Sequence, residues 1–217
     1  MRDYLILKLQ GPMQAWGRES FEGLRPSELF PGRSALLGLL GACLGIDRID
    51  REGLQALASS VSFAVRVDHQ GQKMTDYHTV KNAREDYRGL KSHDTIQTWR
   101  EYWQDAFYTV AVWNNDNATL SLDRIEHALK RPHYTPVLGR RSCPLARPLL
   151  DNRVSAESAL AALALSGDTG GTVYSEECTD NAIPIKKRDT PIIHQPRQFA
   201  SRTLYMSHGQ GGEYVSE

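Results

Sequence analysis

Strand-like and helix-like patterns follow one another along the first 150 residues in a particular order: strand, helix, strand, strand, helix, strand. Strand-like segments place apolar residues at alternating positions or in short runs, and helix-like segments repeat them every three or four residues. The strand-like segments are 4–9, 61–67, 107–113 and 144–150, and the helix-like segments are about 34–44, 54–60 and 122–130. This order predicts a ferredoxin-like α+β fold.

A polar insertion of about 69–106 separates the second strand-like segment from the third. The insertion is rich in His, Arg and Tyr and is too long for a hairpin turn. After residue 150, an Ala- and Leu-rich helical stretch at 155–165 precedes short strand-like pieces separated by Gly and Pro. We therefore expect one domain over 1–150 that carries the insertion, and a small C-terminal β-rich subdomain over 151–217.

The first helix-like segment has Ser34 as its expected N-cap and three glycines on nearly one face. These glycines, Gly38, Gly41 and Gly45, each cost about 1 kcal/mol of helix propensity. Close packing has to compensate for that cost, so we expect the helix to lie unusually near a sheet or a neighbouring backbone. No Lys-Ser or Lys-Thr pair follows the glycines, and they lie inside a helical pattern, which excludes a phosphate-binding loop of the Walker type.

The chain is neutral overall, with 26 basic and 26 acidic residues, and neutrality by itself argues against nucleic-acid binding. The charges are nevertheless unevenly spread. Residues 130–148 hold five basic residues and no acidic ones, 184–203 hold five basic and one acidic, and 151–180 hold one basic and six acidic. A groove of one sign could form from such patches. Alternatively, the charges average out over the folded surface.

Three widely spaced cysteines, Cys43, Cys143 and Cys178, form no C-x-x-C pair, which favours a cytoplasmic protein without structural zinc. The longest apolar run, 35–45, is about half the roughly 20 residues that span a bilayer. The N-terminus has the pattern of a strand and not of a signal peptide. We expect no membrane association, no metal and no cofactor.

The insertion interleaves basic, aromatic and hydroxyl side chains. Basic side chains neutralise phosphates, flat rings stack on bases and hydroxyls hydrogen-bond, a combination that suits single-stranded RNA. The candidates are His78, Arg84, Tyr87, Arg88, Lys91, Ser92 and His93. The alternative is a solvated hairpin with internal ion pairs, because residues 76–101 hold five basic and five acidic residues.

Four further residues of the insertion, Ile96, Trp99, Arg100 and Trp103, have helical spacing. We expect the two tryptophans to pack internally or to contact a protein partner, and not to form a base-stacking platform. This segment therefore supports a rival function, that of a structural scaffold whose insertion docks on protein.

Two loops outside the insertion are also candidates for RNA contact. In Gly139-Arg140-Arg141-Ser142, the glycine lets the backbone approach a phosphate and the arginine forks suit it bidentately. In the segment after the first strand, Gln14 can hydrogen-bond a base edge and Trp16 can stack. For Trp16, burial in the core is at least as good an explanation.

A second rival function is that of a metal-independent endoribonuclease that cuts repeat RNA. Such an enzyme needs a general base, a general acid and a cation, and His78 or His93 could serve as the base. The chain has no H-E-x-x-H, G-x-S-x-G or Walker motif. A lone loop histidine is more often a hydrogen-bonding residue than a catalytic one, so we expect no enzyme activity.

Seven segments in the same order along the chain carry a resemblance to a known family. They are 11–17 (GPMQAWG), 33–45 (RSALLGLLGACLG), 84–93 (REDYRGLKSH), 97–102 (QTWREY), 134–136 (YTP), 139–144 (GRRSCP) and 196–202 (PRQFASR). Together they make the chain similar to the CasD family, the Cas-five subunits of type I-E CRISPR Cascade complexes. The match after about residue 152 is loose except near Phe199, and residues 69–75 are shorter than expected for the family.

The resemblance implies a fold, a function and partners. The fold would be a ferredoxin-like core, RRM-like and of the repeat-associated RNA-binding superfamily, with the insertion as a thumb. The function would be non-catalytic: holding the 5′ handle of the crRNA in an antiviral ribonucleoprotein. The partners would be the crRNA, the CasC backbone that the subunit caps, the large CasA subunit and, indirectly, target DNA.

The RNA-contact set expected from the loops and the resemblance is drawn from four parts of the chain. It comprises Gln14, Trp16, Arg25, Arg33, His78, Arg84, Tyr87, Arg88, Lys91, Ser92, His93, Gly139, Arg140, Arg141 and Ser142.

Overall fold

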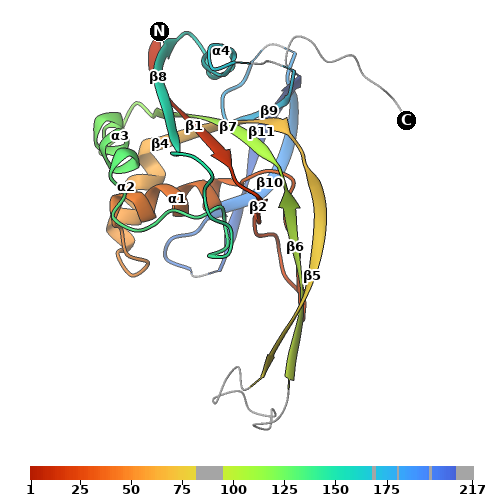
Figure 1. The fold of residues 1–217 in the computed structure, drawn as a ribbon. Helices are drawn as coiled ribbons and strands as arrows, with labels where there is room; N and C mark the ends of the chain where they lie inside the picture. Colours follow the sequence, from red (N-terminus) through yellow and green to blue (C-terminus); the bar gives the residue numbers. More distant parts are fainter. Residues whose placement is uncertain (82–94, 168–169, 180, 196, 209–217) are drawn as a thin grey trace.

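The computed structural model describes residues 1–81, 95–167, 170–179, 181–195 and 197–208. Its largest feature is an antiparallel sheet of seven strands in the order β10-β11-β9-β4-β7-β1-β8 (Figure 1). The strands are β1 (Arg2–Gln10), β4 (Val61–His69), β7 (Phe107–Asn114), β8 (Leu150–Ala156), β9 (Thr172–Ser175), β10 (Ile183–Pro191) and β11 (Phe199–His208). The fold is therefore α+β with antiparallel sheets.

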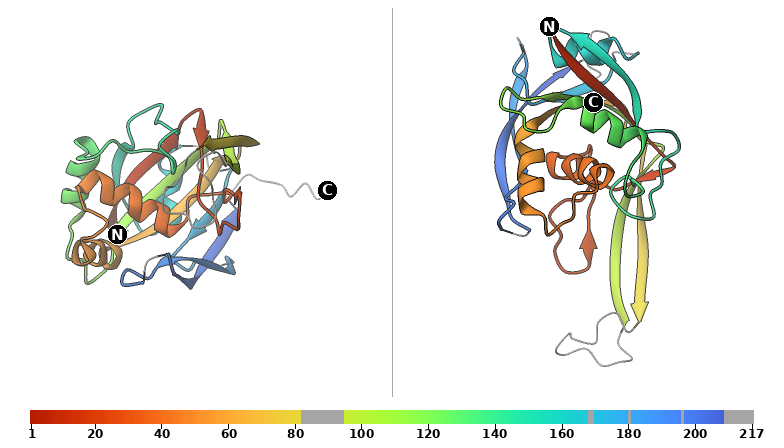
Figure 2. Two further views of the ribbon diagram at one scale, coloured as in Figure 1. Left: turned by 90° about the horizontal axis from the view of Figure 1, so that it is seen from below. Right: turned by 90° about the vertical axis from the view of Figure 1, so that its left-hand side faces the viewer.

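A second, smaller sheet is built on the polar insertion. Strands β5 (Gln72–Lys81) and β6 (Thr95–Gln104) pair along their whole length as an antiparallel hairpin. At the root of the hairpin, β6 also pairs with β2 (Met13–Gln14) and, in parallel, with β3 (Leu24–Arg25). The hairpin projects from the body of the molecule, as Figures 1 and 2 show.

The helices cover both faces of the large sheet. Helices α1 (Arg33–Leu44), α2 (Arg51–Ser60) and α3 (Leu122–Lys130) lie on one side and the short α4 (Ala159–Ala164) on the other (Figure 1). Successive strand residues point to opposite faces. Leu7 of β1 accordingly belongs to the main core under α1 and α3, and Ile6 to a smaller cluster under α4.

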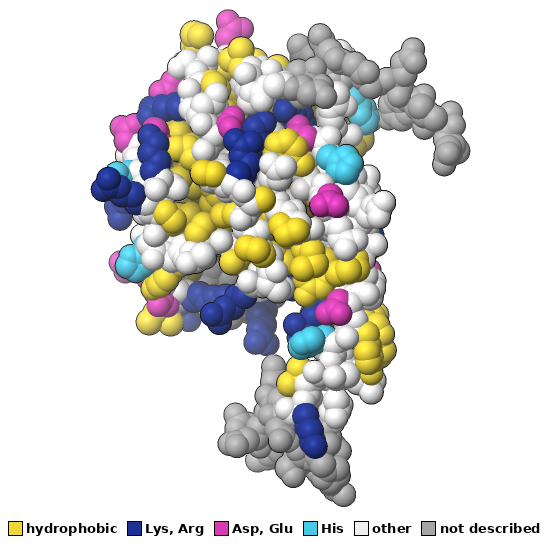
Figure 3. Space-filling view, in the orientation of Figure 1, with side chains coloured by type: hydrophobic (Ala, Val, Ile, Leu, Met, Phe, Trp, Pro, Cys, Tyr) yellow, Lys and Arg dark blue, Asp and Glu magenta, His cyan; other side chains and the backbone are white. Residues whose placement is uncertain are grey.

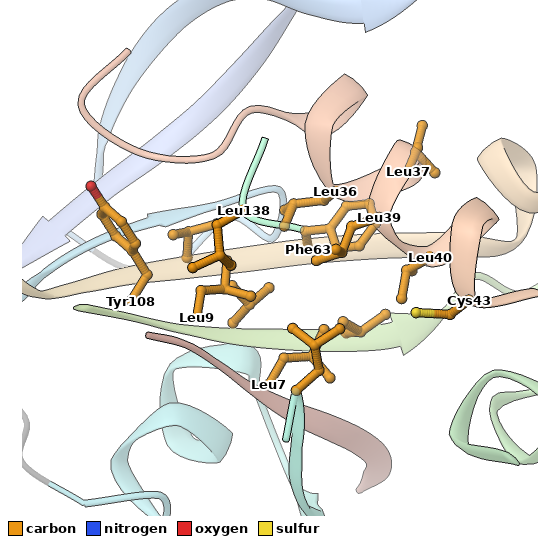
Figure 4. Packing of buried hydrophobic residues seen from close by; sticks show 14 of the residues in the cluster. Leu7, Leu9, Leu36, Leu37, Leu39, Leu40, Cys43, Phe63, Tyr108 and Leu138 are labelled. Atoms are coloured by element: carbon orange, nitrogen blue, oxygen red, sulfur yellow. The ribbon is translucent and has the colours of Figure 1, made fainter. Parts of the chain in front are cut away.

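Helix α1 presents its leucines to the sheet. Leu36, Leu39 and Leu40 are buried on the side of Phe63 of β4, whereas Leu37, also buried, points away from it (Figure 4). Burying one such side chain contributes about 1.5–3 kcal/mol. The helix is thus fixed by its buried leucines, and the positions between them carry small side chains.

The predicted N-cap and glycine packing of α1 are both wrong. The N-cap residue is Gly32, and the capping carboxylate comes from a distant strand: Asp189 of β10 accepts the backbone N–H of Arg33 at 2.8 Å. A Cβ added at Gly38 would meet nothing within 4 Å, so no backbone approaches there. Gly45 is the C-cap in the left-handed conformation, with φ of 75°, which explains why a glycine stands at that position.

Most other predicted elements are confirmed. The strands at 4–9, 61–67 and 107–113 are present as β1, β4 and β7, and the predicted helix 122–130 is α3. The strand predicted at 144–150 is wrong, because β8 begins only at Leu150. Pro144 and Pro148 lack the N–H groups that a paired strand needs.

Two further predictions are wrong, one about the type of an element and one about the length of a helix. The helical spacing of Ile96, Trp99, Arg100 and Trp103 does not produce a helix, since all four lie in β6 between β5 and β3. The helix predicted at 155–165 is shorter, because residues up to Ala156 pair with β1 as β8. The division into domains at residue 150 stays a prediction.

Candidate nucleic-acid interface

A groove with a volume of about 1780 Å³ opens beside α1. Its walls come from the segment after β2, the start of α1, the loop before α2, the loop at 134–140 and strand β10. Seven basic residues line the groove: Arg18, Arg48, Arg140, Lys186, Lys187, Arg188 and Arg197. Four acidic residues line it as well: Glu19, Glu28, Asp47 and Asp189. Seven positive charges against four negative ones leave the lining with an excess of three positive charges.

The floor of the groove is the small-residue face of α1. Five residues of the helix with short side chains line the groove, namely Ser34, Ala35, Gly38, Gly41 and Ala42, together with the buried Leu39. Gly38 therefore leaves space for whatever occupies the groove, whereas a Cβ at Gly41 would already contact Leu57 of α2 at 3.8 Å.

The two basic patches seen in the sequence meet at this groove. Arg140 comes from the patch at 130–148, and Lys186, Lys187, Arg188 and Arg197 come from the patch at 184–203. The acidic segment 151–180 contributes none of the described lining residues. The sequence suggested a groove lined by charges of a single sign. The structure shows a groove lined by both signs, with an excess of basic residues. Figure 3 shows Lys and Arg side chains gathered along the lower edge of the body, near the hairpin root.

Several of the groove carboxylates are already engaged. Glu28 lies 3.1 Å from the Lys187 ammonium and 3.9 Å from the Arg18 guanidinium. Asp189 is paired with Arg202, which lies outside the groove lining, at 2.5 Å. The Glu28 pairs are partly exposed, and such pairs are worth about 0–1 kcal/mol each, so a phosphate can displace this carboxylate at little cost, whereas Asp189 is buried in its pair with Arg202.

The exposed basic side chains are the ones best placed for an anionic ligand. Arg18 and Arg188 are largely exposed, and Lys186 is tied only to the Thr203 hydroxyl at 2.8 Å. Lys187 is more fixed, since its ammonium also lies over the Phe30 ring, 4.5 Å from the centroid. Two aromatic residues, Tyr134 and Phe199, also line the groove and could offer rings to a base.

The structure buries two of the predicted contact residues. The Gln14 amide is fully inaccessible and donates to the carbonyls of Leu9, at 3.1 Å, and Ala106, at 2.6 Å. Trp16 is buried in the main core, edge-on to Tyr108. Both side chains are held inside the body of the molecule, so neither is available to contact a base.

Arg33 and Arg25 also have partners within the chain. Arg33 is buried, forms an ion pair with Glu176 at 2.6 Å and donates to the carbonyls of Ala58 and Val61. Arg25 donates to the carbonyls of Glu22 and Leu24. Arg33 thus fastens the start of α1 to the large sheet.

The loop 139–142 separates its two arginines. Gly139 has φ of 90°, and a Cβ there would lie 1.8 Å from the Ala15 carbonyl oxygen, so only glycine fits. Arg140 turns toward the hairpin root, whereas Arg141 and Ser142 are exposed. Arg141 has no ion pair with any described residue.

The remaining predictions fall on the hairpin. His78 lies on β5, half-buried, and its Nδ1 has no hydrogen-bond partner within the described chain. Arg84, Tyr87, Arg88, Lys91, Ser92 and His93 lie outside the described residues. In the ranges that the structure covers, no group of three or more His, Cys, Asp or Glu side chains could hold a metal ion. No helix in those ranges is long and apolar enough to cross a membrane.

Sequence reasoning missed several groove residues. Lys186, Lys187, Arg188 and Arg197 were visible as a basic patch, but their place in the site depends on β10 lying beside the start of α1. Arg18 and Arg48 are isolated in the sequence and gave no signal.

Comparisons with known proteins identify the family of the chain. Residues 4–205 match the family described as CRISPR-associated protein (Cas_Cas5), and the chain therefore belongs to the Cas-five family. It is 54% identical to "CRISPR system Cascade subunit CasD" of Escherichia coli (strain K12), over the full length of both chains.

Two solved structures are also similar to this chain. The chain is similar to one in a "CRISPR RNA-guided surveillance complex", with a TM-score of 0.75 and 27% identity over 95% of this chain and 90% of that one. A "Crystal structure of Cas protein" has a TM-score of 0.64 and 28% identity, covering 94% of each chain.

Proposed function

We propose that this chain is a non-catalytic, cytoplasmic subunit of a Cascade-type surveillance complex, in which it holds the 5′ handle of the crRNA. One observation carries the proposal: five separated segments bring seven basic side chains to a single groove floored by small residues. The membership of the Cas-five family and the likeness to a Cascade subunit supply the context for that groove.

The chemistry of the groove suits an unpaired RNA backbone. Lys and Arg neutralise phosphates and release their counterions, which is the main source of affinity for nucleic acids. The small side chains of α1, Gly38 above all, let the sugar–phosphate chain approach the helix closely. Tyr134 and Phe199 at the rim are candidates to stack on bases.

The finer features of the fold belong to the same proposal. The order β4-β7-β1-β8, with helices between β1 and β4 and between β7 and β8, supports a ferredoxin-like core of the RRM-like type. The projecting β5–β6 hairpin supports a thumb, and the segment after residue 150 is proposed as a C-terminal subdomain that extends the same sheet through β9–β11.

Exposed apolar side chains on the hairpin support contacts with protein subunits. Phe21, Leu24, Tyr77 and Trp99 are between 41% and 75% exposed. Leu24 pairs with Trp99 across β3 and β6, and the Tyr77 and Trp99 rings lie 5.5 Å apart. Apolar patches of this kind usually mark interfaces. We propose that the neighbours are backbone (CasC) and large (CasA) subunits, and that contact with target DNA is indirect.

The groove is tested by removing charge inside it and, in a matched control, elsewhere. Lys186→Ala with Arg188→Ala removes two positive charges from the groove, and Arg124→Ala with Arg131→Ala removes two from exposed positions outside it. We expect the first pair to weaken binding of labelled crRNA about tenfold and to reduce the salt slope by roughly 1–2. The control pair should bind as the parent chain does. Equal effects of both pairs would refute the assignment of the groove.

The non-catalytic part of the proposal is tested separately. Incubating the purified chain with labelled repeat RNA in EDTA should leave the RNA intact. A discrete cut that disappears in a His78→Ala variant would instead establish the endoribonuclease alternative, since that reaction needs a base but no metal.

A further inference from the structure

The adjacent arginines Arg140 and Arg141 do different things. We infer that Arg140 is a positioning residue that fixes the hairpin against the RNA groove, while Arg141 is the phosphate contact. This inference rests on the proposed function for the groove, but its structural half stands on contacts within the chain.

The Arg140 guanidinium bridges two strands at the hairpin root. One nitrogen donates to the Glu101 carbonyl of β6 at 2.9 Å and the other to the Arg25 carbonyl of β3 at 2.8 Å. The guanidinium carbon also lies 4.5 Å from the centroid of the Tyr102 ring. The planar fork of arginine suits two acceptors held side by side, and lysine cannot reproduce that geometry.

This bridge lies where the β3–β6 ladder ends. The two strands pair in parallel only through Leu24↔Trp99 and Arg25↔Arg100. The next residue, Pro26, has no N–H to donate, so β3 cannot extend the ladder with another donor of its own. Arg140 supplies two donors at that point from outside both strands.

The loop that carries Arg140 is itself anchored on the body. Leu138 accepts the Ala15 N–H at 3.1 Å and donates to the Cys143 carbonyl at 2.8 Å. The fit of Gly139 against the Ala15 carbonyl fixes the residue that follows it. Arg140 therefore connects a fixed part of the groove wall to the hairpin.

A second contact holds the same root. The Glu101 carboxylate accepts the Ser27 N–H at 3.0 Å and lies 2.9 Å from the Lys73 ammonium. Burial alone would raise the pKa of Glu101, but these two hydrogen bonds outweigh it and the pKa is lowered. The carboxylate is thus charged at neutral pH and helps Arg140 to hold the hairpin.

Arg141 differs in each respect. Its side chain is exposed, follows the last groove residue of the loop without lining the groove itself, and pairs with no described carboxylate, so its charge is available to a phosphate at the edge of the groove. Two neighbouring arginines of the same charge therefore provide a matched pair for experiment.

The two roles predict different salt dependences. A phosphate contact contributes to the slope of log K against log salt, by roughly 0.7 for a single strand, whereas a positioning residue contributes nothing to it. We expect Arg141→Gln to lower this slope for labelled crRNA by about one phosphate contact. Arg140→Gln should weaken crRNA binding about tenfold and leave the slope as in the parent chain.

Hydrogen exchange of the full chain without RNA provides the second readout. Amides of the peptide 95–104 should exchange at least several-fold faster in Arg140→Gln and in Arg140→Lys, and at the parent rate in Arg141→Gln. A lowered salt slope in Arg140→Gln together with unchanged hairpin exchange would overturn the inference. Faster exchange in Arg140→Gln, combined with no effect of any groove variant on crRNA, would refute the proposed function and leave the positioning role standing.

Discussion

The carboxylate of Asp189 accepts the backbone N–H of Arg33 at 2.8 Å and so caps the first turn of α1 from strand β10, 156 residues away in the chain. The same carboxylate pairs through both oxygens with the Arg202 guanidinium, at 2.5 and 2.8 Å. Arg202 and Arg33 in turn share Glu176, at 2.9 and 2.6 Å. This network joins the groove floor to the groove wall.

We therefore expect Asp189→Ala to destabilise the fold by about 2–4 kcal/mol, because it removes a helix cap and leaves Arg202 with one carboxylate fewer. Urea unfolding of the variant measures the loss. Lys186→Ala, on the same strand but with an exposed side chain, is the control and should change the free energy of unfolding by less than about 0.5 kcal/mol. Equal stability of Asp189→Ala and the parent would contradict the role of the network.

The glycines of α1 give opposite predictions. Gly38→Ala should stabilise the fold by about 0.5–1 kcal/mol, because the position is helical and a Cβ there meets nothing within 4 Å. Gly45→Ala should destabilise it by more than about 1 kcal/mol, because φ is 75° and the Cβ would lie 2.8 Å from the His133 ring. Thermal unfolding of the two variants, measured beside the parent chain, tests both predictions. Destabilisation by Gly38→Ala would show that another part of the chain covers this face of the helix.

The three cysteines should differ in reactivity. Burial raises the pKa of Cys43 to about 11 and also raises that of Cys143, whereas Cys178 is exposed. Because the thiolate is the reactive form, a thiol reagent at pH 8 should modify one thiol quickly in the native chain and all three after denaturation. Rapid modification of a Cys178→Ser variant in its native state would contradict the burial of the other two.

The raised pKa values also predict the pH dependence of stability. The buried Cys43 thiol has a pKa of about 11 in the folded chain and an ordinary pKa near 9 in the unfolded chain. Between pH 9 and pH 11 the thiol is therefore protonated in the folded state and largely ionised in the unfolded state. The contribution of this thiol to the free energy of unfolding is complete below pH 9 and is lost as the pH rises toward 11. Tyr108 and Tyr174, whose pKa values burial also raises, act in the same direction. The free energy of unfolding should fall between pH 9 and 11, and a constant value there would contradict the assignment.

The hairpin patch predicts a loss of assembly and not of RNA binding. Replacing Tyr77 and Trp99 by Ala should reduce incorporation into a reconstituted complex while leaving crRNA affinity of the isolated chain unchanged, because apolar contacts contribute to protein interfaces. Ile49→Ala with Leu165→Ala removes exposed apolar side chains elsewhere and is the control. Loss of crRNA affinity in the hairpin variant would make the aromatic pair an RNA contact instead.

The pattern of apolar and capping residues in the sequence predicted those elements that depend on neighbouring residues in the chain. Strand β1 is a mainly apolar run that is buried over six consecutive residues, and α3 has a clear apolar face, an N-cap at Ser121 and the Arg131-Pro132 stop. Strand β6 was different: Ile96, Trp99, Arg100 and Trp103 fit a helix by spacing, and only pairing with β5 and β3 makes the segment extended. Tertiary pairing overrode the local pattern there.

The groove could be predicted only in part for the same reason. Two basic patches were evident in the sequence, but their meeting depends on β10 lying beside the start of α1, which is a consequence of sheet order. The burial of Gln14 and Arg33 was not predicted, because their partners, Ala106 and Glu176, are far away in the chain. For Trp16, burial was one of the two alternatives, and its contact with Tyr108 decides in favour of it.

The central claim is that the leading end of the crRNA occupies the groove beside α1, and photocrosslinking tests it most directly. A crRNA carrying 4-thiouridine at single positions of its 5′ handle is bound to the full chain in the assembled complex, irradiated and mapped by peptide mass. The account predicts crosslinks within 134–142 and 186–199. Handle crosslinks confined to α3, or to other subunits, would contradict it.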